Sequence, residues 1–183
     1  INTLYKGADN KIWIGTSQGL HWYSPIKDSI YHVSEVPTNS IISLFEDSQN
    51  QLWLGTEKKG IYLYSPKYPR SLLHLNQSTL TFNGPVRKIV ELDSSYLLVS
   101  RSGIFELDIY NQSDSTTFNI TPISKEIRYR DAVLDTANNV VWIGSRDGLY
   151  RYKDGQIELQ GSINTGIVAR IQTLALDQDG TLW

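Results

Sequence analysis

A short motif recurs along this chain at nearly constant spacing, and this repeat limits the possible folds more than any other feature. Its core is an apolar residue, Trp, another apolar residue, Gly and then Thr or Ser, followed by a polar turn, Leu or Ile, and Tyr three residues later. Trp13 and Trp53 are 40 residues apart, and Trp142 and Trp183 are 41 apart. Such a period predicts a repeat architecture in which each copy packs on its neighbours.

Five copies of the motif can be aligned. The 89 residues between Trp53 and Trp142 leave room for one degenerate copy, in which Leu97 takes the Trp position and Val99 takes the Gly position. We expect the copies to occupy approximately residues 1–40, 41–85, 86–128 and 129–170, with the start of a further copy at 171–183.

Each copy has the composition of short β-strands. Segments such as "ISLF", "QLWLGT" and "GIYLYS" are rich in β-branched and aromatic residues, and turns such as "DSQN" and "DQDG" separate them. A weaker fourth strand follows, for example "SLLHL" or "QIELQG". Because no segment sustains an apolar period of 3.6, we expect no substantial helix.

Four antiparallel strands in every ~40–45 residues are typical of a β-propeller blade. The predicted fold class is therefore all-β, a β-propeller with about four four-stranded antiparallel blades plus the start of a fifth. Since the motif is interrupted at Trp183, we expect these blades to be part of a larger, seven-bladed propeller. A self-contained four-bladed ring is the alternative.

Composition and charge exclude several classes of protein. Hydrophobic residues make up 40% of the chain and charged residues 20%, as in a folded domain. The formal net charge of −2 gives no electrostatic case for direct contact with nucleic acid. Cysteine is absent, which excludes disulfides, thiolate metal sites and a cysteine nucleophile. No apolar run reaches the ~18 residues of a membrane helix. The chain starts at Ile1 and has no Met, so we expect a piece of a longer protein.

Most residues that suggest chemistry have a structural interpretation. The repeated tryptophans are expected to pack in the core, whereas Trp22 lies outside the repeat position and could stack on a sugar. The Asp-rich turns offer too few ligands for calcium, and Glu46 with Asp47 is expected in a solvated turn. Three scattered histidines show no metal-binding spacing, and no nucleophile elbow or phosphate loop occurs. We therefore predict no catalytic residue, no metal and no cofactor.

The variable turns between the second and third strands are the candidate ligand site. In a propeller these turns emerge on one face, together with the connections between blades. The cations expected there are Lys58, Lys59, Arg101 and Arg146, and Arg130 and Arg170, near the starts of first strands, could join them. Such a rim suits an acidic or hydroxyl-rich sugar. The alternative is a solvated rim that only keeps the surface soluble.

The repeat motif is more specific than the pattern that propellers share in general. The segments "LFEDSQNQLWLGTEKKGIYLY" and "LALDQDGTLW" resemble the two-component regulator propeller repeat, and the resemblance extends over nearly the whole chain. The Trp-Asp and Gly-His dipeptides that characterise WD40 blades do not occur at the corresponding positions of this repeat. The third copy, "YLLVSRSGIFELD", departs most from the pattern, and the first has "KGADNK" in place of an Asp-x-x-Gly turn.

This resemblance implies a function that the residues alone do not give. Members of the family, many of them from Bacteroidetes, usually form the periplasmic sensor of membrane-bound hybrid histidine kinases that detect glycans and control polysaccharide-utilisation genes. By resemblance, the chain would be a non-enzymatic sensor piece that binds an oligosaccharide. Its parent would be a membrane-anchored, homodimeric kinase.

Two alternatives remain open from the sequence. A structural or protein-interaction propeller without a small ligand would be favoured if Trp22, Tyr62 or Tyr68 formed an exposed apolar patch. A propeller enzyme such as a lyase or glycosidase would need convergent acid and base groups or a metal, and none is visible in the sequence.

Overall fold

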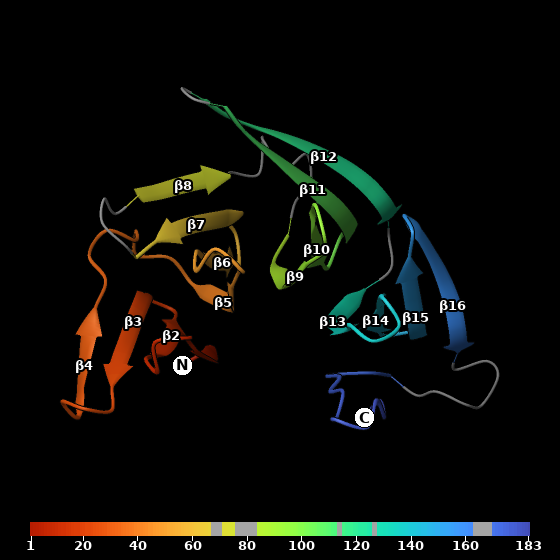
Figure 1. Ribbon diagram of the computed structural model, residues 1–183, viewed down its shortest axis with the longest axis horizontal. Helices are drawn as coiled ribbons and strands as arrows, with labels where there is room; N and C mark the ends of the chain where they lie inside the picture. Colours follow the sequence, from red (N-terminus) through yellow and green to blue (C-terminus); the bar gives the residue numbers. More distant parts are fainter. Residues whose placement is uncertain (67–70, 76–83, 113–114, 126–127, 163–169) are drawn as a thin grey trace. The chain divides into compact units, whose positions relative to one another are not determined.

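The computed structural model describes residues 1–66, 71–75, 84–112, 115–125, 128–162 and 170–183. Within these ranges every regular element is a β-strand, and the strands form four antiparallel sheets of four strands each (Figure 1). The expected all-β class and the four-stranded blade are confirmed. No helix in the described ranges is long and apolar enough to cross a membrane.

The first two sheets follow the chain in strand order. The first contains β1 (Thr3–Lys6), β2 (Ile12–Thr16), β3 (Gly19–Ser24) and β4 (Ser29–His32). The second contains β5 (Ile41–Glu46), β6 (Leu52–Thr56), β7 (Ile61–Ser65) and β8 (Ser71–Leu75). Each strand is hydrogen-bonded to the next, as expected of hairpin-linked blades.

The other two sheets repeat this order. The third contains β9 (Val86–Glu91), β10 (Tyr96–Ser100), β11 (Gly103–Gln112) and β12 (Ser115–Lys125). The fourth contains β13 (Tyr129–Asp135), β14 (Val140–Ser145), β15 (Gly148–Lys153) and β16 (Gln156–Ser162). A further hairpin follows, closed by a single bridge between Leu176 and Leu182. The chain divides into two compact units, residues 1–89 and 90–183.

In the first unit, the repeat motif packs one blade on the next. Trp13 and Trp53 are 4% and 0% exposed, which confirms the expectation that they belong to the core. The glycine two residues after each Trp permits a close backbone approach. A Cβ added to Gly15 would lie 2.6 Å from Thr3, and one added to Gly55 would lie 2.0 Å from the Ser43 hydroxyl.

The second unit shows how the degenerate copy keeps its core. Leu97 and Val99, in the Trp and Gly positions, are both fully buried in a cluster that also holds Ile143 and Tyr152. Aliphatic side chains fill the space that Trp occupies elsewhere, so the blade keeps its packing without the motif. In the fourth blade the glycine is retained, and a Cβ on Gly144 would lie 2.3 Å from Ile171.

An aspartate six residues before the Trp organises the turn between the first two strands of a blade. One oxygen of Asp47 accepts the backbone N–H groups of Gln49 and Gln51 at 3.0 and 2.8 Å, and the other accepts the Trp53 indole N–H at 2.8 Å. Asp47 is only 6% exposed, so the expectation of a solvated turn was wrong for this residue. Its burial is possible because its oxygens accept these donors.

Asp177 repeats this arrangement in the C-terminal hairpin. It accepts the N–H groups of Asp179 and Thr181 and the Trp183 indole N–H at 2.9 Å. These bonds to a carboxylate lower the pKa of Asp177, the indole bond having the largest effect. Trp183 itself is 74% exposed, which corrects its expected place in the core.

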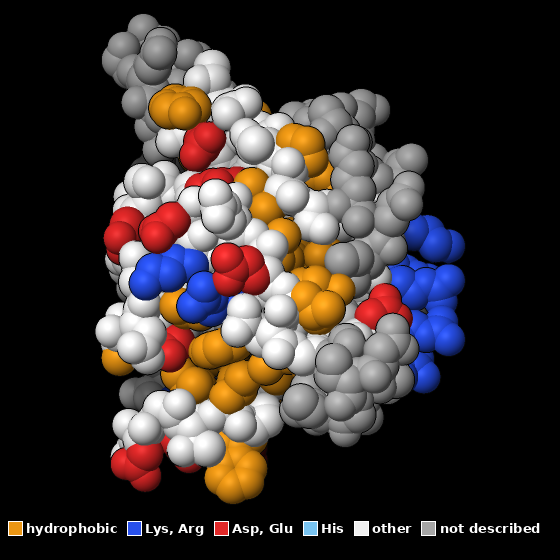
Figure 2. All heavy atoms as spheres, turned by 90° about the vertical axis from the view of Figure 1, so that its right-hand side faces the viewer, with side chains coloured by type: hydrophobic (Ala, Val, Ile, Leu, Met, Phe, Trp, Pro, Cys, Tyr) orange, Lys and Arg blue, Asp and Glu red, His pale blue; other side chains and the backbone are white. Residues whose placement is uncertain are grey.

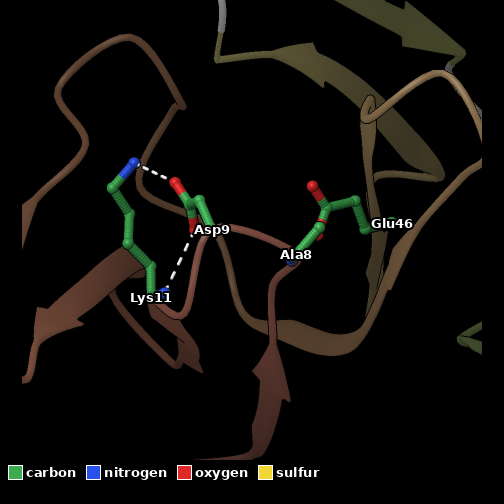
Figure 3. Close-up of polar contacts among 4 residues, drawn as sticks. All are labelled: Ala8, Asp9, Lys11 and Glu46. Carbon is green, nitrogen blue, oxygen red and sulfur yellow. Dashed lines mark hydrogen bonds and ion pairs between the residues drawn. The ribbon is translucent and has the colours of Figure 1, made fainter.

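The first blade lacks the aspartate, since Gly7 stands in its position. A carboxylate from the second blade reaches this turn and accepts a different N–H: an oxygen of Glu46, at the end of β5, accepts the Ala8 N–H at 2.9 Å. Figure 3 shows the Glu46 side chain directed at this turn, in which Asp9 pairs with Lys11. A Cβ on Gly7 would lie 3.0 Å from the Trp13 indole nitrogen and 3.1 Å from Glu46 Oε2.

Candidate functional site

Within each unit, the turn between second and third strands lies beside the connection that enters the same blade. In the first unit the Glu57 N–H donates to the Ser40 carbonyl at 3.0 Å. In the second unit the Arg146 N–H donates to the Arg128 carbonyl at 3.2 Å. The expected clustering of these turns and connections at one end of a blade therefore holds in both units.

Lys58 and Lys59 lie in the β6–β7 turn of the first unit, and both are exposed. The turn is held by Thr56, whose hydroxyl donates to the Gly60 carbonyl at 2.8 Å and accepts the Lys59 N–H at 2.8 Å. A ring nitrogen of His74 on β8 lies 2.7 Å from the Lys59 carbonyl oxygen. The backbone of this turn is thus fixed, while both ammonium groups extend from its surface.

The second unit gathers several arginines at the start of its fourth blade. Arg128 and Arg146 are exposed and share the backbone hydrogen bond described above. Arg170 is exposed and directly precedes Ile171, whose N–H donates to the Ser145 carbonyl at 3.0 Å. We call Arg128, Arg146 and Arg170 the arginine cluster. Arg128 was not singled out from the sequence, although its place just before a first strand could have indicated it.

Arg130 and two acidic residues, Asp131 and Asp147, also lie at this end of the blade. Arg130, on β13, is half-buried, and its guanidinium donates to the Gln172 side-chain oxygen at 2.7 Å. Asp131 accepts from Thr173 and from the Leu174 N–H, and Asp147 follows Arg146 directly. Arg130 therefore has a structural contact with the C-terminal hairpin, and the exposed cluster provides the positive charge.

Arg101 occupies the equivalent turn of the third blade, between β10 and β11, and is exposed. Its turn is built by Ser100, whose hydroxyl accepts the Ser102 N–H at 3.0 Å. Arg101 and the arginine cluster belong to one unit, whereas Lys58 and Lys59 belong to the other.

Trp22 has internal contacts on its ring. It lies half-buried on β3, with its ring stacked on Tyr31 at 4.4 Å between centroids and the Lys11 ammonium 5.2 Å from its centroid. Tyr62 is 5% exposed, and its hydroxyl accepts from the Asn39 amide at 3.0 Å. The exposed apolar patch considered for Trp22 and Tyr62 is therefore not formed, because internal packing occupies both rings. Tyr68 lies outside the described residues.

A polar pocket lies at the other end of the fourth blade, between it and the third. Its volume is about 170 Å³, and its lining includes Asp93, Asp154 and Lys153. At its base Glu106 accepts from the Ser95 hydroxyl at 2.6 Å and from the Tyr152 hydroxyl at 3.1 Å. Burial, together with the nearby Glu106 carboxylate, raises the pKa of Tyr152 and keeps the phenol protonated.

The outer side of the fourth blade carries charges of both signs. Arg151 on β15 pairs with Glu158 on β16 at 2.7 Å. Figure 2, which looks onto the side where β16 lies, shows basic and acidic side chains close together beside exposed hydrophobic ones. Mixed charge of this kind is ordinary for a solvated surface and does not define a ligand site.

Metal-ligating residues do not converge in the described part of the chain. His21 and His32 face each other across β3 and β4, with ring centroids 4.9 Å apart. The sequence spacing did not reveal this pair. No group of three or more His, Asp and Glu residues that could hold a metal occurs among the described residues.

Comparison with known proteins agrees with this architecture. The extracellular domain of a protein named as a hybrid two component system of B. thetaiotaomicron is 20% identical, with a TM-score of 0.73. The match covers 94% of this chain and 24% of that one, so the chain spans about a quarter of its length. PorZ, a surface component of the type-IX secretion system of Porphyromonas gingivalis, is 15% identical over 98% of this chain and 31% of its own, with a TM-score of 0.66.

A third structure, streptogramin B lyase, is 14% identical, with a TM-score of 0.71, over 98% of this chain and 60% of its own. No match was found among curated proteins. Together the four-stranded blades and these likenesses define a β-propeller fold. Residues 35–58, from the entry of the second blade to its β6–β7 turn, match the family model described as two component regulator propeller. The resemblance inferred from the sequence is confirmed in this blade.

Proposed function

We propose that this chain is part of the signal-input domain of a membrane-bound hybrid two-component histidine kinase. The observation that carries the proposal is the regulator-propeller repeat at residues 35–58 within a propeller fold. The name of the similar B. thetaiotaomicron structure, an extracellular domain of a hybrid two component system, supports it. The domain would face the periplasm. Kinase activity, a membrane anchor and control of polysaccharide-utilisation genes would belong to the longer protein, and the receptor would act as a homodimer.

The ligand that best fits is an oligosaccharide with carboxylate or sulfate groups. Guanidinium groups bind such groups with two parallel hydrogen bonds, and the arginine cluster places three of them at one end of the fourth blade. Arg101 and Arg130 in the same unit, and Lys58 and Lys59 in the other, extend the candidate set. The polar pocket carries Asp93, Glu106 and Asp154 against Lys153, so it suits neutral hydroxyl groups instead.

Binding would act by changing the relative populations of two receptor states. The shift in this equilibrium can be no larger than the ligand's difference in affinity for the two states. The arginine cluster lies where the fourth blade meets the C-terminal hairpin, so a bound ligand would fix these two segments relative to each other.

The test is thermal-shift and calorimetric screening of the complete extracellular portion against oligosaccharides grouped by charge. We expect acidic oligosaccharides to raise the melting temperature in a dose-dependent way. Arg128→Gln, Arg146→Gln and Arg170→Gln should each weaken binding. Lys153→Gln, at the other end of the same blade, is the matched control and should leave it unchanged.

Two results would count against this proposal. Selective binding of neutral sugars that is lost in Asp93→Asn or Asp154→Asn would move the site to the polar pocket. Absence of binding by every oligosaccharide would favour the second candidate function, a protein-interaction propeller without a small ligand. One observation favours that candidate: Tyr110, on a long hairpin of the third blade, is 53% exposed.

A further inference from the structure

The β11–β12 hairpin extends well beyond its own sheet. Strand β10 pairs with β11 only from Gly103 to Leu107. The pairing of β11 with β12 continues through five more residue pairs, from Asp108–Asn119 to Gln112–Ser115. Figure 1 shows the two long strands reaching past the shorter strands of this blade. We call residues 108–112 and 115–119 the arm.

The base of the hairpin packs on its unit, whereas several described side chains of the arm are exposed. Near the base, Ile123 packs against the buried cluster and the Tyr129 hydroxyl donates to Ser124 Oγ at 2.8 Å. On the arm, Tyr110 is 53% exposed and Thr117 and Asn119 are exposed. Two antiparallel strands alone are marginally stable in water. We therefore expect a further contact to stabilise the arm.

Strand β12 also has an unusual edge. It is the last strand of its sheet, so its outer backbone groups face no strand within the sheet. Soluble proteins usually protect such edges with charged side chains, which discourage pairing with another chain. From Ser115 to Ser124 this strand has no ionisable side chain that is charged at neutral pH, and Thr, Ile and Phe dominate it. By contrast, the edge strand β16 carries Glu158, which pairs with Arg151.

We propose that β12 pairs edge to edge with β12 of a second copy of this chain. A two-fold interface brings the same surface of both copies together, so that surface must be complementary to itself. An uncharged strand meets this condition, because no like charges face each other across the interface. Pairing would continue both sheets into one and would give the outer backbone groups of β12 hydrogen-bond partners. Pro122, which has no N–H, limits the pairing toward the base.

The test uses the chain of 183 residues and measures its mass by sedimentation equilibrium over a range of concentrations. The wild type should form a dimer that dissociates on dilution. One variant, Thr117→Lys with Thr121→Lys, places positive charges on the exposed face of the edge. A second, Thr117→Glu with Thr121→Glu, places negative charges there. Each variant should be monomeric alone, and an equimolar mixture should form the heterodimer.

Mixing makes this test independent of the pairing register, since opposite charges attract in any alignment of the two strands. Circular dichroism and thermal unfolding of each variant check that the fold is retained. A wild type that stays monomeric up to millimolar concentration would overturn the proposal. So would a dimer that persists in the lysine variant, because its interface would then lie elsewhere. Dimer formation requires no sugar, so this experiment and the ligand screen succeed or fail separately.

Discussion

The indole N–H of Trp53 donates to the carboxylate of Asp47 at 2.8 Å, and both side chains are buried. The same carboxylate accepts two backbone N–H groups of its turn, so one side chain fixes both the hairpin and the aromatic ring at the centre of the blade. Trp53 is thus held by a charged hydrogen bond as well as by packing.

Replacing Asp47 by Ala should strongly destabilise the chain. The change removes the acceptor of three donors, among them the buried Trp53 indole N–H, and we expect a loss of about 2–4 kcal/mol in the free energy of unfolding. Asp47→Asn retains one acceptor oxygen and should cost less. Urea titration followed by circular dichroism measures both. Asp177→Ala is the matched control, and its effect should be much smaller because Trp183 is exposed. Equal losses at the two positions would contradict the role of burial.

The first blade permits a rescue experiment. Glu46→Ala removes the acceptor of the Ala8 N–H and should cost about 1–2 kcal/mol. Adding Gly7→Asp to this variant should recover most of the loss, because residue 7 stands six residues before Trp13, as Asp47 stands before Trp53. In the wild-type background Gly7→Asp should be unfavourable, since its side chain would begin 3.1 Å from Glu46 Oε2. A double variant no more stable than Glu46→Ala would show that the two carboxylates are not equivalent.

Gly55 should tolerate no side chain. An added Cβ would lie 2.0 Å from Ser43 Oγ and 2.5 Å from the Val86 carbonyl oxygen, two atoms that are themselves hydrogen-bonded at 2.8 Å. We expect Gly55→Ala to cost about 3 kcal/mol or more in the free energy of unfolding. Gly155→Ala is the control: its Cβ would meet nothing within 4 Å, and its positive φ of 76° limits the cost to about 1–2 kcal/mol. Similar costs at both positions would argue against close packing at Gly55.

High pH should unfold the second unit. Burial raises the pKa of Tyr129 to about 12, against an ordinary value of about 10 in an unfolded chain. A raised pKa means that the folded state holds the proton more tightly. The stabilisation is therefore complete below pH 10 and is lost as the pH rises toward 12. Thermal melts between pH 8 and 12 should show a falling melting temperature. Tyr129→Phe should make this fall shallower, and an unchanged slope would contradict the assignment.

The sequence predicted the strands and blades because each depends on local pattern. Alternating apolar residues and Asn or Asp turns indicated the hairpins, and the recurring Trp and Gly indicated the packing between blades. The hydrogen bond between Trp53 and Asp47 could also have been predicted, since Asp stands six residues before Trp twice in the sequence. The contact between Glu46 and Ala8 could not, because 38 residues separate the partners and no motif connects them.

The candidate site was harder to predict than the fold. The exposure of Arg146 and Arg101 follows from their turns, but the position of Arg128 beside Arg146 depends on how one blade is connected to the next. Trp22 differs from the expectation because its neighbour across the strands is Tyr31, a pairing set by the strand register. The length of the arm likewise depends on where β10 stops pairing.

The hydrogen bond from the Ala8 N–H to the Glu46 carboxylate also affects the order in which the turns of the two blades form during synthesis. Asp47 stabilises a turn within six residues of itself, so its hairpin can close as soon as that segment leaves the ribosome. The turn at Ala8 waits for a residue made 38 positions later. The blade of β1–β4 is therefore synthesised before the second blade, but its turn at Ala8 is complete only after β5 of the second blade has been made.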